Sequence, residues 1–126
     1  MNYQQQAASN GIPKNVSVHK LAASAADDLV AARTNYQYYV QRLTYVPTIV
    51  TANAITVRSK TTTTNIYALI PASQATPYTA DFGPEGLAVT AGEILEAVST
   101  AGPQGWFRVE GYYKLSSVIG AHAANQ

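Results

Sequence analysis

Short apolar segments, each ended by turn residues, are the feature of this sequence that most restricts its fold. The segments are rich in β-branched and aromatic residues, which favour strands. Glycine, proline and small polar residues separate them roughly every 8–12 residues, a spacing typical of an antiparallel sandwich or barrel. The segments expected to form strands are 15–20, 36–46, 54–59, 65–70, 93–99 and 106–115, with a short apolar pair at Leu87 and Val89.

Two places along the chain carry clear local signals. The long segment 36–46 should end at Pro47, because proline cannot donate a hydrogen bond to a sheet. Residues 101–105 read Ala-Gly-Pro-Gln-Gly between two strand-like segments, which is the strongest hairpin signal in the chain. Alternation within 36–46 predicts one face with Tyr39, Leu43 and Tyr45 and the opposite face with Tyr38, Val40 and Val46.

Segment 21–33 fits two structures. It is rich in alanine, and an apolar stripe beginning at Leu21 would share one face of a helix. A strand is the alternative, because Leu29 and Val30 form a short apolar run beside many other strands, with residues 34–35 as the following turn. Propensity alone favours the helix. We favour the strand because of the family resemblance described below.

The chain is expected to form one domain with two extended ends. Its 126 residues suit a single hydrophobic core. We expect an extended N-terminal arm at 1–18, a β-sandwich domain at 19–119 and a frayed tail at 120–126. The first residues are rich in glutamine, asparagine and alanine, so they would be ordered only if something else holds them, and a floppy terminus is the alternative.

Composition excludes several classes of function. Charged residues make up only 12% of the chain, about half the usual share, and the net charge is +1. Lysine and arginine are not clustered, so we expect no nucleic-acid partner. We also expect a soluble protein with no membrane partner, because neither a secretory signal nor a run of about 20 apolar residues is visible. The chain lacks cysteine, and His19 and His122 lie near opposite ends, so no metal or cofactor is expected.

Catalytic signals are weak, and we expect that the chain is not an enzyme. Motifs for a serine nucleophile, a phosphate-binding lysine loop or a dinucleotide are absent. The glycine-rich stretch 83–86 contains Pro84, which lacks the backbone donor that a phosphate cradle would use, so this stretch indicates a turn. The remaining alternative is a small hydrolase with a carboxylate pair drawn from Asp81, Glu85 and Glu110.

Nine tyrosines accompany the low charge. The centres of protein interfaces are depleted in charged residues and enriched in aromatic ones, so this composition favours association with other subunits. The alternatives are core packing, and a stacking platform for sugars or single-stranded nucleic acid. The candidates for an oligomer interface are Tyr36, Tyr38, Tyr39, Tyr45, Tyr112 and Tyr113.

Residues 28–115 resemble a family of small phage virion proteins, the decoration or fibre-type β-sandwich modules. The likeness is carried by the order of several segments. These are D-L-V-A-A-R at 28–33, Y-V-Q-R-L-T-Y-V at 39–46, A-I-T-V-R-S at 54–59, D-F-G-P-E-G-L-A-V-T-A-G-E at 81–93 and W-F-R-V-E-G-Y-Y-K-L at 106–115.

The resemblance implies a jelly-roll-like antiparallel β-sandwich located in the virion, often a homotrimer, with no catalytic residues. The leading hypothesis is a bacteriophage capsid decoration or cement protein that stabilises the head by binding across subunits of the major capsid protein. The alternative is a carbohydrate- or receptor-binding module of a phage fibre. Arms like the N-terminal one commonly mediate attachment, and its attachment candidates are Tyr3, Ile12, Pro13 and Val16.

Overall fold

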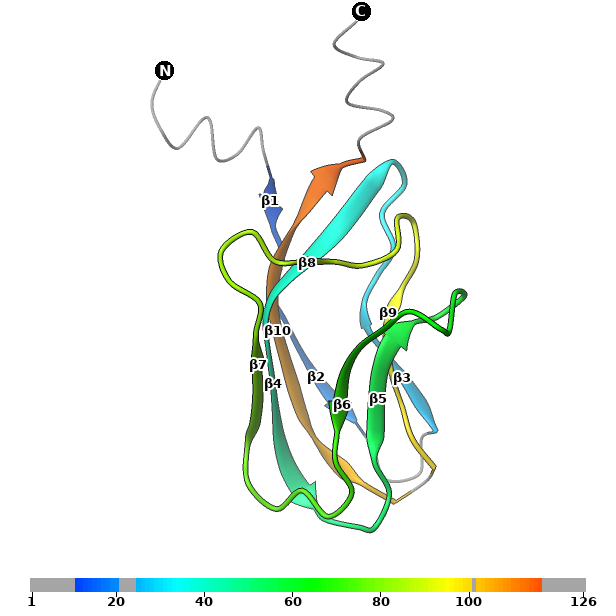
Figure 1. The fold of residues 1–126 in the computed structure, drawn as a ribbon, viewed down its shortest axis with the longest axis vertical. Helices are drawn as coiled ribbons and strands as arrows, with labels where there is room; N and C mark the ends of the chain where they lie inside the picture. The colour runs from blue at the N-terminus through cyan, green and yellow to red at the C-terminus, as the bar shows by residue number, and fades with distance from the viewer. Residues whose placement is uncertain (1–10, 21–24, 101, 117–126) are drawn as a thin grey trace, which may run out of the picture.

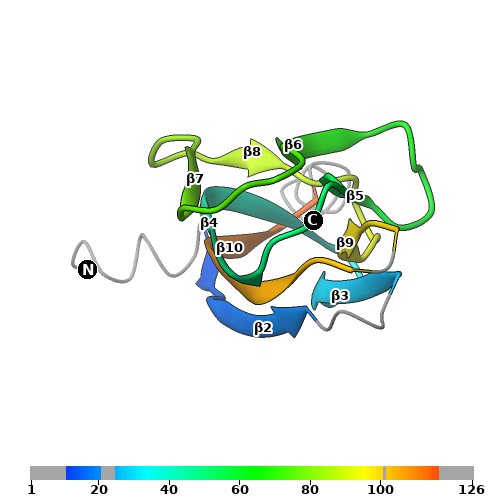
Figure 2. The same cartoon turned by 90° about the horizontal axis from the view of Figure 1, so that it is seen from below.

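Two antiparallel sheets face each other in the computed structural model, which describes residues 11–20, 25–100 and 102–116. Every regular element in this part of the chain is a β-strand, and Figures 1 and 2 show the two layers. The described residues contain no helix long and apolar enough to cross a membrane. The predicted all-β antiparallel sandwich is therefore confirmed, and its jelly-roll character stays a prediction.

The larger sheet is built on two long central strands, β4 (Tyr36–Ile49) and β10 (Gln104–Leu115), which pair along almost their whole length. Each edge of this six-stranded sheet consists of two short strands in succession. The short strands are β1 (Ile12–Pro13) and β2 (Val16–Lys20) against β10, and β7 (Tyr78–Asp81) and β8 (Leu87–Ala88) against β4.

The smaller sheet has four strands in the order β3-β9-β5-β6. Its edges are β3 (Ala26–Val30) and β6 (Ile66–Ile70), and its inner strands are β9 (Leu95–Val98) and β5 (Ile55–Ser59). The strand favoured for part of segment 21–33 is confirmed as β3, while residues 21–24 lie outside the described residues. Asn35 adopts a φ of 68° in the predicted turn before β4, a conformation that asparagine tolerates well.

The inward-facing positions of both sheets form one core, which excludes water between the layers. Its members come mostly from strands and alternate with more exposed residues, as a half-buried sheet requires. The core consists of Leu29, Val30, Tyr38, Val40, Leu43, Tyr45, Ile55, Val57, Ala68, Ile70, Val89, Leu95, Ala97, Phe107, Val109 and Tyr113.

A β-bulge in β4 reverses the predicted alternation. Glu110 pairs with Arg42 but Gly111 pairs with Val40, so Gln41 is the extra residue. As a result Leu43 and Tyr45 point into the core together with Tyr38 and Val40, and the prediction that Tyr39 shares their face is wrong. A run of alternating residues cannot reveal where one extra residue shifts the phase.

Both edges of the larger sheet are interrupted at the level of this bulge. The gap between β1 and β2 and the gap between β7 and β8 both face the bulge. The amide of Lys14 donates to the carbonyl of Gly111 at 2.9 Å, and the amide of Phe82 donates to the carbonyl of Gln41 at 2.8 Å. Backbone bonds therefore continue through the irregular region although the strands do not.

Two further predictions about the ends of strands are wrong. Strand β4 continues past Pro47 to Ile49, because a second register shift, between Gln104 and Gly105, accommodates the missing donor. Strands β9 and β10 belong to different sheets, so the turn residues between them mark a crossover and not a hairpin. Turn residues allow a change of direction, but they do not determine which sheet the next strand joins.

The predicted N-terminal arm is partly included in the larger sheet, since β1 and β2 pair with β10. Residues 1–10 and the predicted tail at 120–126 lie outside the described residues. At the end of β2, the side chain of Lys20 is fully buried, and its ammonium lies 3.9 Å from the carboxylate of Asp27 in β3. This pair links the two sheets where their edges meet, and burial lowers the pKa of Lys20.

Candidate interaction surfaces

The six tyrosines predicted for an interface divide into a buried and a half-buried group. Tyr38, Tyr45 and Tyr113 are at most 5% exposed. Their rings pack inside the subunit: the ring centres of Tyr38 and Tyr113 lie 5.2 Å apart, and those of Tyr45 and Phe107 lie 4.7 Å apart. Of the six, the half-buried Tyr36, Tyr39 and Tyr112 are therefore the ones that offer surface to another subunit.

Several tyrosine hydroxyls fasten loops and the N-terminal strands to the sheets. Tyr38 donates to the carbonyl of Lys14 at 2.7 Å, next to the gap between β1 and β2. Tyr113 donates to the carbonyl of Ala31, and Tyr112 donates to that of Glu85, each at 2.6 Å. Burial raises the pKa of all three hydroxyls above the ordinary value for tyrosine.

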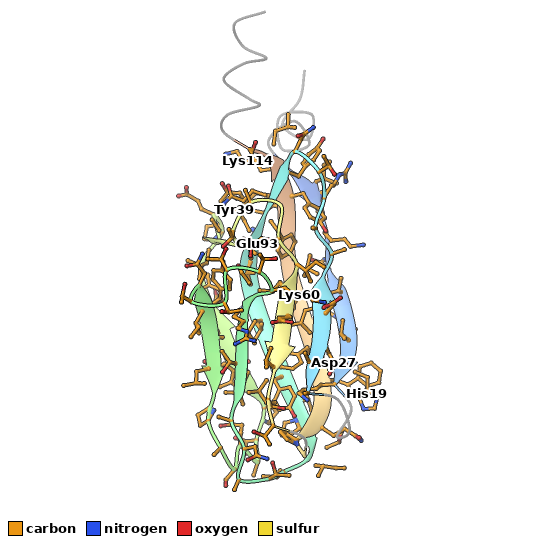
Figure 3. The ribbon with its side chains drawn as sticks, turned by 90° about the vertical axis from the view of Figure 1, so that its right-hand side faces the viewer. His19, Asp27, Tyr39, Lys60, Glu93 and Lys114 are labelled. Carbon is orange, nitrogen blue, oxygen red and sulfur yellow. The ribbon has the colours of Figure 1, made fainter. Side chains whose placement is uncertain are left out.

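Two stacked aromatic pairs lie on the outer face of the larger sheet. Tyr39 and Tyr112 are cross-strand partners with ring centres 5.2 Å apart and planes 7° apart. His19 and Trp106 are also cross-strand partners, with ring centres 4.5 Å apart and planes 10° apart. Figure 3 shows His19 near one end of the molecule and Tyr39 towards the other. Within each pair, each ring covers one face of the other ring. The uncovered face and the edge of each ring are left for contacts with other molecules.

Exposed apolar residues gather where β4 ends and β10 begins. Trp106 is 48% exposed and lies beside Val46, while Gln104 lies beside Ile49. We call Val46, Ile49, Val50 and Trp106 the apolar end; all four are between 43% and 48% exposed. None of these four residues was among the interface or attachment candidates predicted from the sequence. The available signal was the stretch 43–57, which contains no charged residue and keeps its apolar residues after Pro47.

Between the two aromatic pairs the outer face carries ion pairs. Arg42 contacts the carboxylate of Asp81 at 3.0 Å, and Arg108 lies 3.7 Å from Glu110. Asp81 also accepts from the amide of Gly83 at 3.0 Å, and the bonds from Gly83 and Arg42 hold its pKa below the ordinary value. A general acid needs the opposite shift, so Asp81 is unsuited to that role in the hydrolase alternative.

Three of the four attachment candidates of the N-terminal arm, Ile12, Pro13 and Val16, lie along β10. Ile12 and Val16 are half-buried and pack against the core, whereas Pro13 is exposed. Pro13, Tyr112 and Lys114 line an open groove of about 470 Å³ together with the loop at 84–85. Tyr3 and His122 lie outside the described residues. Within those residues, no three histidine, aspartate or glutamate side chains gather closely enough to hold a metal ion.

The fold is similar to that of a chain in the acidic stable capsid of Helicobacter pylori bacteriophage KHP30. The two chains share a fold. Their TM-score is 0.60 and their sequence identity is 12%, and the alignment covers 82% of this chain and 89% of the other. At this identity the likeness concerns the fold and not the activity. No protein-family model matches the chain, and no curated protein matches its sequence.

Proposed function

We propose that the chain is a bacteriophage virion protein that decorates the capsid and stabilises the head by binding across subunits of the major capsid protein. The observation that carries the proposal is the apolar end, a group of four exposed apolar side chains that includes a tryptophan. Clustered exposed apolar residues on a small protein indicate an interaction site. The fold shared with a chain of a phage capsid supports the choice of partner.

Trp106 would be the anchor of this attachment. Tryptophan is enriched among the residues that dominate binding energy, especially where less critical contacts surround it and exclude water. The ring is held on one side by His19 and lies beside Val46 on a strand paired on both sides, so little ordering would be needed on binding. The family resemblance favours a homotrimer, for which Tyr36, Tyr39 and Tyr112 are the surface candidates.

Binding to phage heads tests the proposal. Heads from a phage that lacks this gene should bind the added protein and become more resistant to heat. Trp106→Ala should weaken binding by at least ~30-fold, since an anchoring tryptophan contributes about 2 kcal/mol or more. The matched control is Leu115→Ala, which changes an apolar residue of 42% exposure at the other end of β10. Failure of the unaltered protein to co-sediment with these heads would contradict the capsid role.

The second candidate is a carbohydrate- or receptor-binding module of a phage fibre. The observation that favours it is that both aromatic pairs, His19 with Trp106 and Tyr39 with Tyr112, lie on one face of the larger sheet. Sugars stack on exposed aromatic rings, and polar side chains between the pairs could bond their hydroxyls. A glycan array separates the two candidates, because selective glycan binding lost in Trp106→Ala is expected only for the fibre module.

A further inference from the structure

Strand β6 is an edge of the smaller sheet that keeps one side of its backbone unpaired by any strand among residues 11–20, 25–100 and 102–116. It pairs with β5 on its other side. Ile66 and Leu69 are 57% and 56% exposed, and they are the most exposed large apolar residues described. Figure 2 shows β6 at the border of the molecule, near β8 of the other sheet. An exposed edge of this kind is a template for another strand.

The remaining edges of the sandwich carry the features that prevent such pairing. Strand β3 contains the charged residues Asp27 and Asp28. The edge formed by β1 and β2 is interrupted at Lys14, and the edge formed by β7 and β8 is interrupted at 82–86 beside Asp81. Charges and short, interrupted strands are usual protections of an edge. In contrast, β6 reads Ile-Tyr-Ala-Leu-Ile, with no charge and no proline.

The surroundings of β6 are also uncharged. Between β6 and segment 87–91 lies an open groove of about 550 Å³, whose lining contains no charged side chain. Tyr67 is the extra residue of a bulge in β6, and its hydroxyl lies 2.6 Å from that of Ser59 and accepts from the amide of Thr90 at 2.9 Å. These bonds fix Tyr67 to the interior of the sandwich. Because the groove beside β6 has no charged side chain, the strand that pairs with this edge should be uncharged as well.

We infer that β6 pairs with β6 of a second copy of this chain, antiparallel and across a two-fold axis. Among the edge strands described, β6 is the one that carries neither charge nor proline and belongs to an edge without a gap, although Tyr67 forms a bulge within it, so it is the best complement that another copy can offer. A two-fold axis presents the same surface from both copies, so no like charges meet across the pair. The pairing joins the two smaller sheets and brings Ile66 and Leu69 of both copies together. This contact does not depend on the capsid role.

The mass of the full chain in solution tests the inference. By sedimentation equilibrium, the unaltered protein should have at least twice the mass of Leu69→Lys, because the substitution separates the copies that are joined at β6. Two lysines across the axis should weaken the pairing by at least ~10-fold. Leu69 is exposed, so the variant should fold, and an unchanged melting temperature would show this. The matched control is Val46→Lys, an apolar residue of similar exposure on a central strand, which should keep the full mass.

Amide hydrogen exchange gives an independent readout of the same contact. The amides of residues 66–70 that do not bond to β5 should exchange at least ~10-fold more slowly in the unaltered protein than in Leu69→Lys, because the free edge becomes hydrogen-bonded. Equal masses for the two proteins would overturn the inference. Slow exchange of these outward amides in both proteins would also overturn it, because the occupant of the edge would then belong to the same chain. Binding to phage heads is measured separately, so failure of the capsid role would be distinguished from failure of this contact.

Discussion

At the scale of single residues, Gly111 is the residue of β10 that faces the β-bulge of β4. A Cβ atom there would collide with the carbonyl oxygen of Tyr39 and come within 2.6 Å of the hydroxyl of Tyr38. Both atoms belong to the facing strand, at the bulge where the edge strands are also interrupted. The bulge therefore depends on a residue without a side chain at this position.

Gly111→Ala should destabilise the fold by about 2–3 kcal/mol, because the backbone of β4 must move to admit the methyl group. The free energy of unfolding in urea measures this change. The control is Gly92→Ala: open space surrounds a Cβ at Gly92, but its φ of 74° disfavours alanine, so a smaller cost of about 1 kcal/mol is expected. If both variants lost the same free energy of unfolding, the backbone of β4 would be able to move away from the methyl group at Gly111 without a measurable loss of stability.

The carboxylate of Glu93 holds the threonine-rich loop after β5. It accepts from the amides of Thr61 and Thr62 at 3.2 Å and 2.7 Å, and from the hydroxyl of Thr62 at 2.5 Å. These bonds, led by those from Thr62, hold the pKa of Glu93 below 4.5, its ordinary value. Because the folded state lowers this pKa, the stabilisation is fully present above about pH 4.5 and is lost as the pH falls through the folded value.

We expect the free energy of unfolding to fall as the pH is lowered below about 4.5, in part because Glu93 becomes protonated. Thr62→Val removes the hydroxyl donor, so the pKa of Glu93 should rise towards its ordinary value and the acid-induced loss of stability should become smaller. Titration of the Glu93 carboxyl by NMR checks the first effect, and urea unfolding at several pH values checks the second. An unchanged pKa in Thr62→Val would contradict the assigned cause.

At the scale of elements, alternation in the sequence predicts most of the strands because each sheet has one buried and one exposed face. Segment 54–59 is an example: Ile55 and Val57 point into the core, and the strand ends as predicted. The bulge at Gln41 was not predictable, since it depends on Gly111, which is distant in the sequence. The sequence also could not predict which of the two sheets each strand joins, because strand pairing depends on tertiary packing.

The same reasoning explains which surface residues were predicted. Half of the six interface tyrosines are core residues, because tyrosine has a large apolar ring to bury; the hydroxyls of Tyr38 and Tyr113 also bond to backbone carbonyls there. The apolar end was missed because Pro47 indicated the end of the strand, whereas the chain continues to Ile49 in the sheet. Residue type was thus informative about aromatic packing but not about exposure.

Tyr38→Phe should loosen the junction of β1 and β2 and reduce the free energy of unfolding by about 1 kcal/mol, because the carbonyl of Lys14 loses its buried donor. Faster amide exchange in residues 11–16 should accompany the loss. Tyr39→Phe is the matched control, since the hydroxyl of Tyr39 makes only a long contact of 3.4 Å with Gln37. The assignment fails if both variants are equally stable.

At the scale of the whole molecule, charges are paired with one another on the outer faces of the two sheets. On the smaller sheet, Arg58 pairs with Glu96 at 3.1 Å and Lys60 pairs with Asp28 at 2.9 Å. The larger sheet carries the pairs of Arg42 and Arg108 described above. The two surfaces proposed for contacts, the apolar end and the edge of β6, have no charged member. Association at either surface should therefore depend on burial of apolar area and not on electrostatic attraction.

This distribution predicts that binding to phage heads changes little with salt. Between about 0.05 M and about 1 M NaCl, screening shortens the range of charge interactions several-fold, yet the affinity should change by less than ~3-fold. Binding isotherms at several salt concentrations measure this directly. Arg108→Gln, which removes a charge beside Trp106 on β10, should leave both the affinity and its salt dependence unaltered. A steep loss of affinity with salt would mean that paired charges of the outer face, and not the apolar end, make the contact.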